Sequence, residues 1–524
     1  MDMQAQQVRP HLPWRVINSA DGQPGPSTHR HSQVENPTPT QGVSTSSGPG
    51  FHINPENTII SSSPVNQDSS SSSANTPIEP AIMDSYRDSQ ASSSSSTLSL
   101  ASESPMTTPG AGSENGEGLG TFFDSGNIPF NADPKRYILV IGGLGFIGSH
   151  TSLELLRNGY NVIIVDNLSN SYLDVLFNIK KLAAKDCIAK GRVMPAVRFH
   201  KLDYQSRDMQ CLLDSYSEPV PTPALAEGGQ QRVTYRSQIV GVIHFAAYKS
   251  VSESIDNPLD YYDNNVCGLV RLLRQLAKYN IRNFVFSSSA TVYGTKANAG
   301  KLLREEDIVH HEETFIDEHG NEVKAEPTMV GLTCPYARTK YFAEAILADV
   351  AASDPDWRIV TLRYFNPVGC DPSGLIGESP RQTPTNLFPV IAQVLTGDRE
   401  RLDIFGSDWN TPDGTPVRDF IHVSDIARGH IAALDKACDV PFRTYNLGSG
   451  TGTTVHEAVK SLEAASGKSI NVNWTGRRAG DVGFCVASNE RATKELGWSP
   501  RESIPKCAQD LWNYVRRLQT GEKK

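Results

Sequence analysis

Short apolar runs alternate with helix-like segments over more than 200 residues from Lys135, and this alternation restricts the possible folds more than any other feature of the chain. The runs are rich in β-branched and aromatic residues, which is typical of strands buried on both faces of a sheet. They cover residues 137–141, 161–165, 198–202, 239–243, 283–286 and 359–362. We therefore predict an α/β fold built on a doubly wound parallel sheet.

The first 133 residues have a different composition. They are rich in Ser, Pro, Thr, Asn and Gly, and they carry 13 acidic against 4 basic side chains. Such a segment buries too little apolar surface to offset the entropy lost on ordering, so we expect residues 1–133 to be a disordered tail. Its Ser-Pro and Thr-Pro steps are candidate sites for proline-directed kinases, and an inert low-complexity tail explains them equally well.

The remaining 391 residues hold 45 basic and 45 acidic side chains. This neutral balance argues against a strongly basic nucleic-acid-binding domain, and the absence of any run of about 18 apolar residues argues against a membrane helix. Residues 1–15 lack the apolar core of a signal peptide, and the eight cysteines include no C-x-x-C pair. We therefore expect a cytoplasmic protein with no metal site, no nucleic-acid partner and no membrane partner.

Two segments within the strand-and-helix region look like insertions, residues 215–238 and 298–332. The second holds nine acidic residues between Glu305 and Glu326. We expect this acidic stretch to be a solvated surface segment rather than core, and the sequence leaves open whether it acts as a lid.

Three glycines follow the first predicted strand at a spacing that suits a dinucleotide. Gly142, Gly145 and Gly148 supply a tight turn, close approach of the backbone to a pyrophosphate, and close packing of the next helix on the sheet. The N-terminus of that helix presents unpaired amides to the phosphates. Asp166, at the end of the second predicted strand, can accept hydrogen bonds from a ribose and would repel a 2′-phosphate, so we expect NAD. Asp203, after the third strand, is a candidate for the adenine edge or an ordinary turn residue.

Tyr336 and Lys340 form a Y-x-x-x-K pair at the start of a helical segment. Side chains four residues apart share one face of a helix, so the ammonium can lie beside the phenol. A nearby cation lowers the pKa of a phenol, which a proton-abstracting tyrosine requires at neutral pH. About one such pair is expected by chance in a chain of this length. The hydroxyls of residues 287–289 follow another predicted strand and should reach the same edge of the sheet.

With these motifs in place, residues 135–520 resemble the UDP-glucose 4-epimerases of the extended short-chain dehydrogenase/reductase superfamily. The matching stretches include GGLGFIGSH from position 142, FSSSATVYG from 286, RYFNPVG from 363, VRDFIHV from 417 and RRAGDV from 477. The resemblance implies a Rossmann-like NAD-binding domain over residues 134–365 and a smaller UDP-sugar-binding domain over 366–524, interleaved with the first.

The resemblance also implies a reaction. UDP-glucose and UDP-galactose are expected to interconvert through a 4-keto sugar, with NAD tightly bound and regenerated in each cycle. The implied catalytic residues are Tyr336 as base, Lys340, Ser289 and Thr291. Implied cofactor contacts, besides Tyr336 and Lys340, are Gly142, Gly145, Phe146, Ile147, Gly148, Asp166, Asn167, Asp203, Phe245, Ala246, Ala247, Lys249, Asn264 and Tyr364. Implied substrate contacts are Asn366, Asn386, Leu387, Phe405, Arg418, Arg478, Asp481 and Cys485.

Two further expectations concern the substrate range and the oligomeric state. At the position of Cys485, family members carry either tyrosine or a smaller residue, and cysteine should leave room for the acetamido group of UDP-GlcNAc and UDP-GalNAc. A homodimer is expected through the helix that carries Val266, Leu269, Val270 and Leu273 and the helix that begins near Tyr336.

Other functions are less well supported by the residues. A nucleotide-sugar 4,6-dehydratase would carry an Asp-Glu pair where this chain has Ala290 and Thr291. A UDP-glucuronate or UDP-pentose 4-epimerase stays open. So does a catalytically silent NAD-binding regulatory protein, although such a protein has no need of a tuned phenol. His422 is interpreted as a structural histidine and Arg477 as a surface charge.

Overall fold

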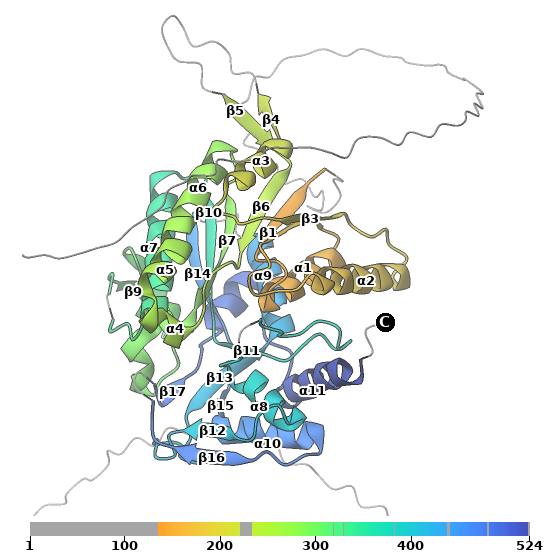
Figure 1. Cartoon of the computed structure of the whole chain (residues 1–524). Helices are drawn as coiled ribbons and strands as arrows, with labels where there is room; N and C mark the ends of the chain where they lie inside the picture. The colour runs from red at the N-terminus through yellow and green to blue at the C-terminus, as the bar shows by residue number, and fades with distance from the viewer. Residues whose placement is uncertain are drawn as a thin grey trace, which may run out of the picture. The chain divides into compact units, whose positions relative to one another are not determined.

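The computed structural model describes residues 135–220, 233–317, 319–328, 330–381, 383–436, 441–478 and 481–521, so the expectation of a disordered tail lies outside the described residues. A seven-stranded parallel sheet in the order β14-β10-β7-β6-β1-β2-β3 forms the centre (Figure 1). Its strands are β1 (Tyr137–Ile141), β2 (Asn161–Asp166), β3 (Val197–Lys201), β6 (Ile239–His244), β7 (Asn283–Ser289), β10 (Arg358–Tyr364) and β14 (Phe442–Leu447). The six predicted strands are all present, and the predicted Rossmann-like sheet is confirmed. The strand order reverses between β1 and β6, where such sheets bind ligands.

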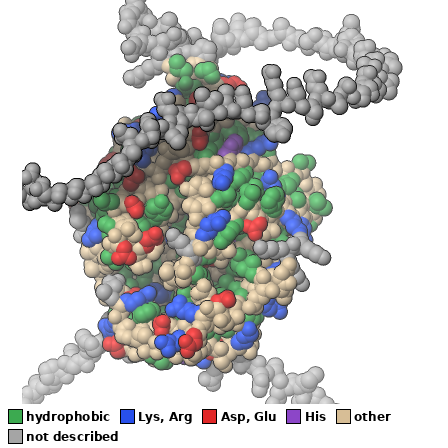
Figure 2. All heavy atoms as spheres, in the orientation of Figure 1, with side chains coloured by type: hydrophobic (Ala, Val, Ile, Leu, Met, Phe, Trp, Pro, Cys, Tyr) green, Lys and Arg blue, Asp and Glu red, His purple; other side chains and the backbone are tan. Residues whose placement is uncertain are grey.

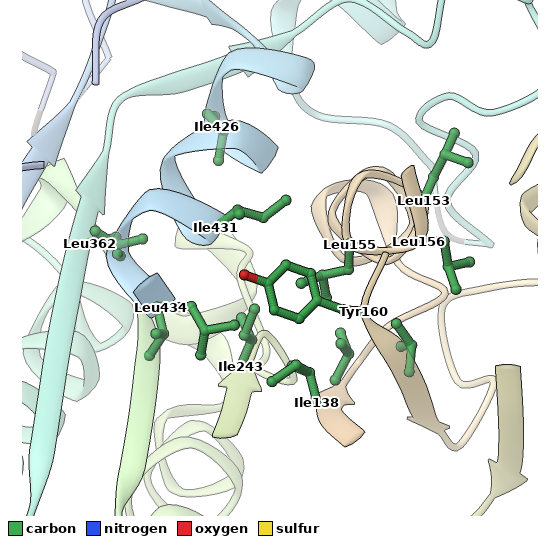
Figure 3. Close-up of a cluster of buried hydrophobic side chains, with 14 of the residues drawn as sticks. Ile138, Leu153, Leu155, Leu156, Tyr160, Ile243, Leu362, Ile426, Ile431 and Leu434 are labelled. Atoms are coloured by element: carbon green, nitrogen blue, oxygen red, sulfur yellow. The ribbon is translucent and has the colours of Figure 1, made fainter. Parts of the chain in front are cut away.

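Helices cover both faces of this sheet. One face packs against α1 (Phe146–Arg157), α2 (Asp174–Ala189) and α9 (Val423–Lys436), and the other against α3 (Arg207–Ser215), α6 (Gly268–Lys278) and α7 (Pro335–Ser353). Successive residues of a strand point to opposite faces, so Ile138 and Val140 join the first cluster and Leu139 joins the second. Figure 3 shows the first cluster around Tyr160, whose hydroxyl donates a hydrogen bond to Asp435.

The chain after β10 forms a smaller group of elements with its own apolar cluster. This group comprises β11 (Asn366–Val368), α8 (Leu387–Thr396), β12 (Leu402–Phe405), β13 (Val417–His422), β15 (Gly452–Thr454), α10 (Val455–Ser466), β16 (Val472–Thr475), β17 (Phe484–Cys485) and α11 (Ile504–Thr520). Between β13 and β15 the chain returns to the large sheet as α9 and β14. Figure 2 shows basic and acidic side chains interspersed on the face in view. Among the described helices, none combines the length and the apolar character needed to cross a membrane.

Each of the two insertions contributes an antiparallel pair of strands. The first contributes the antiparallel pair β4 (Ser217–Val220) and β5 (Thr234–Ser237), and the second contributes β8 (Glu313–Ile316) and β9 (Glu322–Ala325). Short helices α4 (Val251–Asp256) and α5 (Pro258–Tyr262) and a π-helical turn (Asp263–Cys267) follow β6.

The expectation that the whole acidic stretch is solvated is wrong for its first part. Glu305 is 2% exposed, and Ile308 and Val309 are buried with it. The reason is that the Glu305 carboxylate accepts a hydrogen bond from the Asn446 amide of β14, 2.7 Å away, so the base of the insertion packs against the sheet.

Candidate functional site

The glycine turn between β1 and α1 leaves no room for side chains. Gly142 has a φ of 78°, and a Cβ atom there would lie 2.8 Å from the amide nitrogen of Ala246. A Cβ atom on Gly148 would lie 2.2 Å from the carbonyl oxygen of Gly142. Gly145 precedes Phe146 and Ile147, which open α1 and whose amides belong to the unpaired first turn. This turn therefore has the shape and the donors that an anionic dinucleotide needs.

Asp166 is fixed beside that turn. Its buried carboxylate accepts hydrogen bonds from the Leu144 amide at 3.0 Å, the Leu168 amide at 2.9 Å and the Ser171 hydroxyl at 2.7 Å. The next residue, Asn167, donates to the Asp203 carboxylate at 3.1 Å. The structure thus brings together the three polar residues predicted at the ends of β2 and β3.

The segment after β6 lies against the same turn, because the amides of Phe245 and Ala246 both donate to the Ile141 carbonyl, at 2.8 and 3.2 Å. Asn265, which the sequence analysis missed, holds this segment in place. Its buried side chain bonds both backbone groups of Tyr248, at 2.9 and 3.0 Å, and donates to the Thr339 hydroxyl of α7 at 3.1 Å. The predicted Asn264 donates to the Asn265 side chain at 2.9 Å.

Tyr336, Lys340 and Ser289 meet where β7 ends and α7 begins. Ser289 lies near enough to the Tyr336 phenol to act on its pKa, and its hydroxyl accepts a hydrogen bond from the Thr291 hydroxyl at 3.1 Å. Lys340 is 3% exposed, and its Nζ donates to the Ser287 carbonyl at 2.5 Å. The hydroxyl groups of Ser287 and Tyr364 also contact each other. The predicted catalytic residues therefore form one group.

Burial dominates the acid-base properties of this group. It raises the pKa of Tyr336 to about 12, although the nearby Ser289 hydroxyl acts in the opposite direction. It also lowers the pKa of Lys340 to about 7, while the charge of Glu344 acts to raise it. Because desolvation disfavours a charge on either residue, the expected lowering of the Tyr336 pKa by Lys340 is not seen in the protein alone.

The predicted substrate contacts of the C-terminal part form a second group. Arg418 and Asp481 form an ion pair at 2.7 Å, and Arg478 approaches the same carboxylate at 3.3 Å. The Arg478 guanidinium lies over the Phe405 ring, 4.5 Å from its centre. Cys485 on β17 is the register partner of Arg418, and β17 packs against residues 290–299, which follow Ser289. This group therefore combines two cations, an acid and an aromatic ring next to the catalytic segment.

Glu378 links a predicted cofactor contact to a predicted substrate contact and was also missed, because it lies in a loop without a sequence pattern. One of its carboxylate oxygens accepts hydrogen bonds from Lys249 at 3.0 Å and from Asn386 at 3.1 Å. Asn386 is the N-cap of α8, and Leu387 is the first residue of that helix. Asn366 instead donates to the Asp419 carbonyl at 3.0 Å.

His422 and Arg477, which were interpreted as a structural histidine and a surface charge, both have partners outside the catalytic group. His422 is 1% exposed, accepts a hydrogen bond from the Ser424 amide and contacts Asp510 at 3.3 Å. Arg477 is 43% exposed and pairs with Asp408 at 2.8 Å. Neither arrangement presents a reactive group to the site.

Comparison with known proteins gives consistent matches. Residues 138–219 and 224–448 match the NAD dependent epimerase/dehydratase family. UDP-glucose 4-epimerase 2 of Arabidopsis thaliana is 43% identical, over 72% of this chain and 95% of that protein. The bifunctional UDP-glucose 4-epimerase and UDP-xylose 4-epimerase 3 of the same plant is 40% identical, over 74% and 98%. The structure of UDP-glucose 4-epimerase from Bifidobacterium longum in complex with NAD+ and UDP has a TM-score of 0.61 and 36% identity, covering 74% of this chain and 100% of that one.

Proposed function

Because the chain belongs to the NAD dependent epimerase/dehydratase family, we propose that it is a UDP-glucose 4-epimerase that interconverts UDP-glucose and UDP-galactose with bound NAD. One observation carries the proposal. The Tyr336 phenol lies near Ser289 and one helical turn from Lys340, at the sheet edge where the glycine turn also lies. This is the arrangement that a proton transfer beside a dinucleotide requires.

The glycine turn, Asp166 at the end of β2 and Asp203 after β3 fit NAD. The α1 amides and Lys249 would hold the pyrophosphate, and Asp166 would hold the adenosine ribose, exchanging one of its present donors for a ribose hydroxyl. We assign residues 134–365 to cofactor binding and 366–524 to the UDP-sugar, with α9 and β14 returning to the first sheet.

Tyr336 acts as the general base for the 4-hydroxyl of the sugar, and Ser289 orients that hydroxyl, with Thr291 behind it. Bound NAD supplies the hydride acceptor for C4 and a positive charge that favours the phenolate. Lys340 would hold the nicotinamide ribose and stabilise the anionic form of Tyr336. Once the 4-keto sugar has turned over, the epimer would form when C4 takes back the hydride on its other face and the C4 oxygen takes back the proton from Tyr336.

The second group binds the nucleotide. Arg418 and Arg478 suit a diphosphate through charge-assisted bonds, Asp481 suits the uridine ribose, and Phe405 offers a ring for the uracil. Asn366, Asn386 and Leu387 complete this end. A UDP-pentose is a second candidate substrate, since one relative is bifunctional for UDP-xylose.

We also propose a homodimer. In α6, Leu269 and Leu273 pack on the sheet and are not available to a partner. Exposed apolar side chains lie on the predicted helix α7 and on the neighbouring α4 and α5. They are Val251, Ile255, Leu259 and Phe342, which are 47%, 59%, 79% and 39% exposed. A second copy covering these side chains would remove them from water. Light scattering at micromolar concentration should report a dimer, and a fully active monomer would contradict it.

A cytoplasmic location is proposed with the enzyme. The seven cysteines among the described residues are all free, which suits a reducing compartment.

The function is tested by incubating purified protein with UDP-galactose and no added NAD. We expect UDP-glucose to form. A protein that retains NAD but converts neither UDP-galactose nor UDP-xylose, even with NAD added, would be a silent dinucleotide binder and would refute the proposal.

A further inference from the structure

A buried cluster of four polar side chains lies directly behind the candidate catalytic residues. We call it the Glu344 cluster, and it consists of Glu344, Arg363, Ser288 and His310. Glu344 and Arg363 are both 0% exposed, and their closest oxygen and nitrogen lie 2.7 Å apart. The Ser288 hydroxyl donates to one carboxylate oxygen of Glu344, and the His310 Nε2 contacts the other at 2.9 Å.

Three members of the cluster belong to the elements that carry the chemistry. Glu344 lies on α7, one helical turn after Lys340. Ser288 and Arg363 are register partners on β7 and β10. Ser288 also stands between Ser287, whose carbonyl accepts a hydrogen bond from Lys340, and Ser289, which lies near the Tyr336 phenol. The cluster therefore fixes the end of β7 against the third turn of α7, directly after the turn that carries Lys340.

The fourth member comes from the second insertion. His310 is buried, and its ring packs on Tyr341 of α7 with the ring centres 4.8 Å apart. Arg363 binds the insertion as well, because its guanidinium donates to the Ile308 carbonyl at 2.9 Å and the Glu305 carbonyl at 3.3 Å. The base of the insertion is thus attached to the same carboxylate and guanidinium that hold α7 against β7.

A buried carboxylate is stable only when donors surround it. Despite burial, Arg363 and His310 hold the pKa of Glu344 down to about 2. The charge of Glu344 in turn raises the pKa of Lys340 against the effect of burial. Removing the His310 side chain would leave one carboxylate oxygen with Arg363 alone and would open a space beside Tyr341.

We propose that the insertion over residues 298–332 positions the active site, with His310 fixing Glu344 and, through it, the alignment of Lys340 and Ser289 with Tyr336. The inference rests on the proposed epimerase function, since it assigns a role in that reaction. His310 is a positioning residue, because the structure places it against Glu344 and Tyr341 rather than against the reacting groups.

The chain offers a matched control. His311, the next residue, contacts Asp349 on the same helix α7 at 3.2 Å, but its side chain is 51% exposed and that of Asp349 is 73% exposed. A histidine-to-alanine change at 311 therefore removes a similar pair from the same helix without opening the core, and surface pairs of this kind contribute little.

The experiment measures kcat and KM for UDP-galactose, bound NAD and the melting temperature in His310→Ala, His310→Gln, His311→Ala and the unchanged protein. We expect His310→Ala to lower kcat at least tenfold with KM and NAD content within about twofold, because small misplacements of catalytic groups cost up to ~10² in rate. His310→Gln keeps a donor near the Nε2 position and should restore kcat to within about threefold, as a single neutral hydrogen bond predicts. His311→Ala should match the unchanged protein.

Two outcomes would overturn the proposal. The first is an unchanged kcat in His310→Ala. The second is an equal loss of kcat in the alanine and glutamine variants that runs parallel to losses in melting temperature and NAD content. If His310→Ala does not fold, His310→Asn, which keeps a polar side chain too short to reach Glu344, gives the same comparison with glutamine. An unchanged protein that does not convert UDP-galactose would instead refute the epimerase function itself.

Discussion

Around Tyr336 the polar side chains are buried and hydrogen-bonded to one another, whereas at the other end of the site Arg478 is 58% exposed and lies over the face of Phe405. The two ends solve different problems. A proton transfer needs groups held within a fraction of an ångström, which a buried and extensively hydrogen-bonded interior provides. Capture of an anionic nucleotide needs cations that water and ligand can reach, and that exchange one partner for another.

The same contrast explains why some charged residues keep one fixed partner and others share partners. Glu344 and Arg363 are fully buried, so each must keep its partner in every state of the protein. Arg418 and Asp481 are 15% and 13% exposed and share their pair with Arg478. Changes at the buried end should therefore act on kcat, and changes at the charged end should act on KM.

The largest effect is expected from Tyr336→Phe. Loss of the phenol hydroxyl removes the general base and should lower kcat by ~10²–10⁴, with NAD content and UDP binding unchanged. The predicted loss of kcat is checked by measuring how fast UDP-glucose forms from UDP-galactose. The predicted unchanged UDP binding is checked by calorimetry. Near-normal turnover would mean that another group accepts the proton.

Acid should act mainly on the sheet region, which carries three buried histidines. Burial lowers the pKa of His150 to about 4, of His244 to about 3 and of His430 to about 4, from 6.5. The unfolded chain then binds more protons than the folded one, so the stability present above pH 6.5 falls as the pH drops toward 4. At pH 5 the free energy of unfolding should be lower than at neutral pH by on the order of 2 kcal/mol for each of these histidines.

Urea unfolding at pH 7.5 and pH 5 measures this loss. The replacement His430→Gln should reduce the difference between the two pH values, because it removes one of the three groups. A midpoint that is the same at both pH values would contradict the assignment of neutral, buried histidines.

Local sequence patterns predicted the motifs of the buried end but not the Glu344 cluster behind them. The strands, the glycine turn, Asp166 and the Tyr336–Lys340 pair were visible because each depends on residues close in sequence. The Glu344 cluster was not, because the contact of Ser288 with Arg363 depends on the register of β7 and β10, and that of His310 on the path of an insertion. Only the position of Glu344, one turn after Lys340, could have suggested it.

At the charged end, Arg418→Met should raise KM for UDP-galactose about 10–100-fold, as loss of a charged hydrogen bond worth ~1.5–3 kcal/mol predicts. The value of kcat should stay within about threefold, because the buried cluster is untouched. Arg477→Met is the matched control. Arg477 lies over the Trp409 ring at 3.9 Å and is bound to the exposed Asp408, so its loss should change KM by less than about twofold. Equal effects of the two changes would remove the distinction between ligand-binding and surface arginines.

The smallest effect on the main reaction is expected at Cys485, where the two ends of the site meet. The side chain lies on β17 beside Arg418 and packs with the cluster that contains Val292 and Tyr293. Burial raises the pKa of its thiol to about 11, so it behaves as a small neutral side chain rather than as a nucleophile. Volume is then the property that can matter for a sugar turning over nearby.

We therefore expect the unchanged protein to interconvert UDP-GlcNAc and UDP-GalNAc as well as the hexose pair. Cys485→Tyr should abolish the N-acetyl activity through a clash with the acetamido group, while UDP-galactose turnover stays within about threefold. Cys485→Ser, which keeps the volume and removes the thiol, should retain both activities. Assays of each variant on UDP-galactose and on UDP-GalNAc measure the ratio of the two activities. An unchanged protein that converts UDP-galactose but not UDP-GalNAc would show that some other residue limits the space around C2 of the sugar.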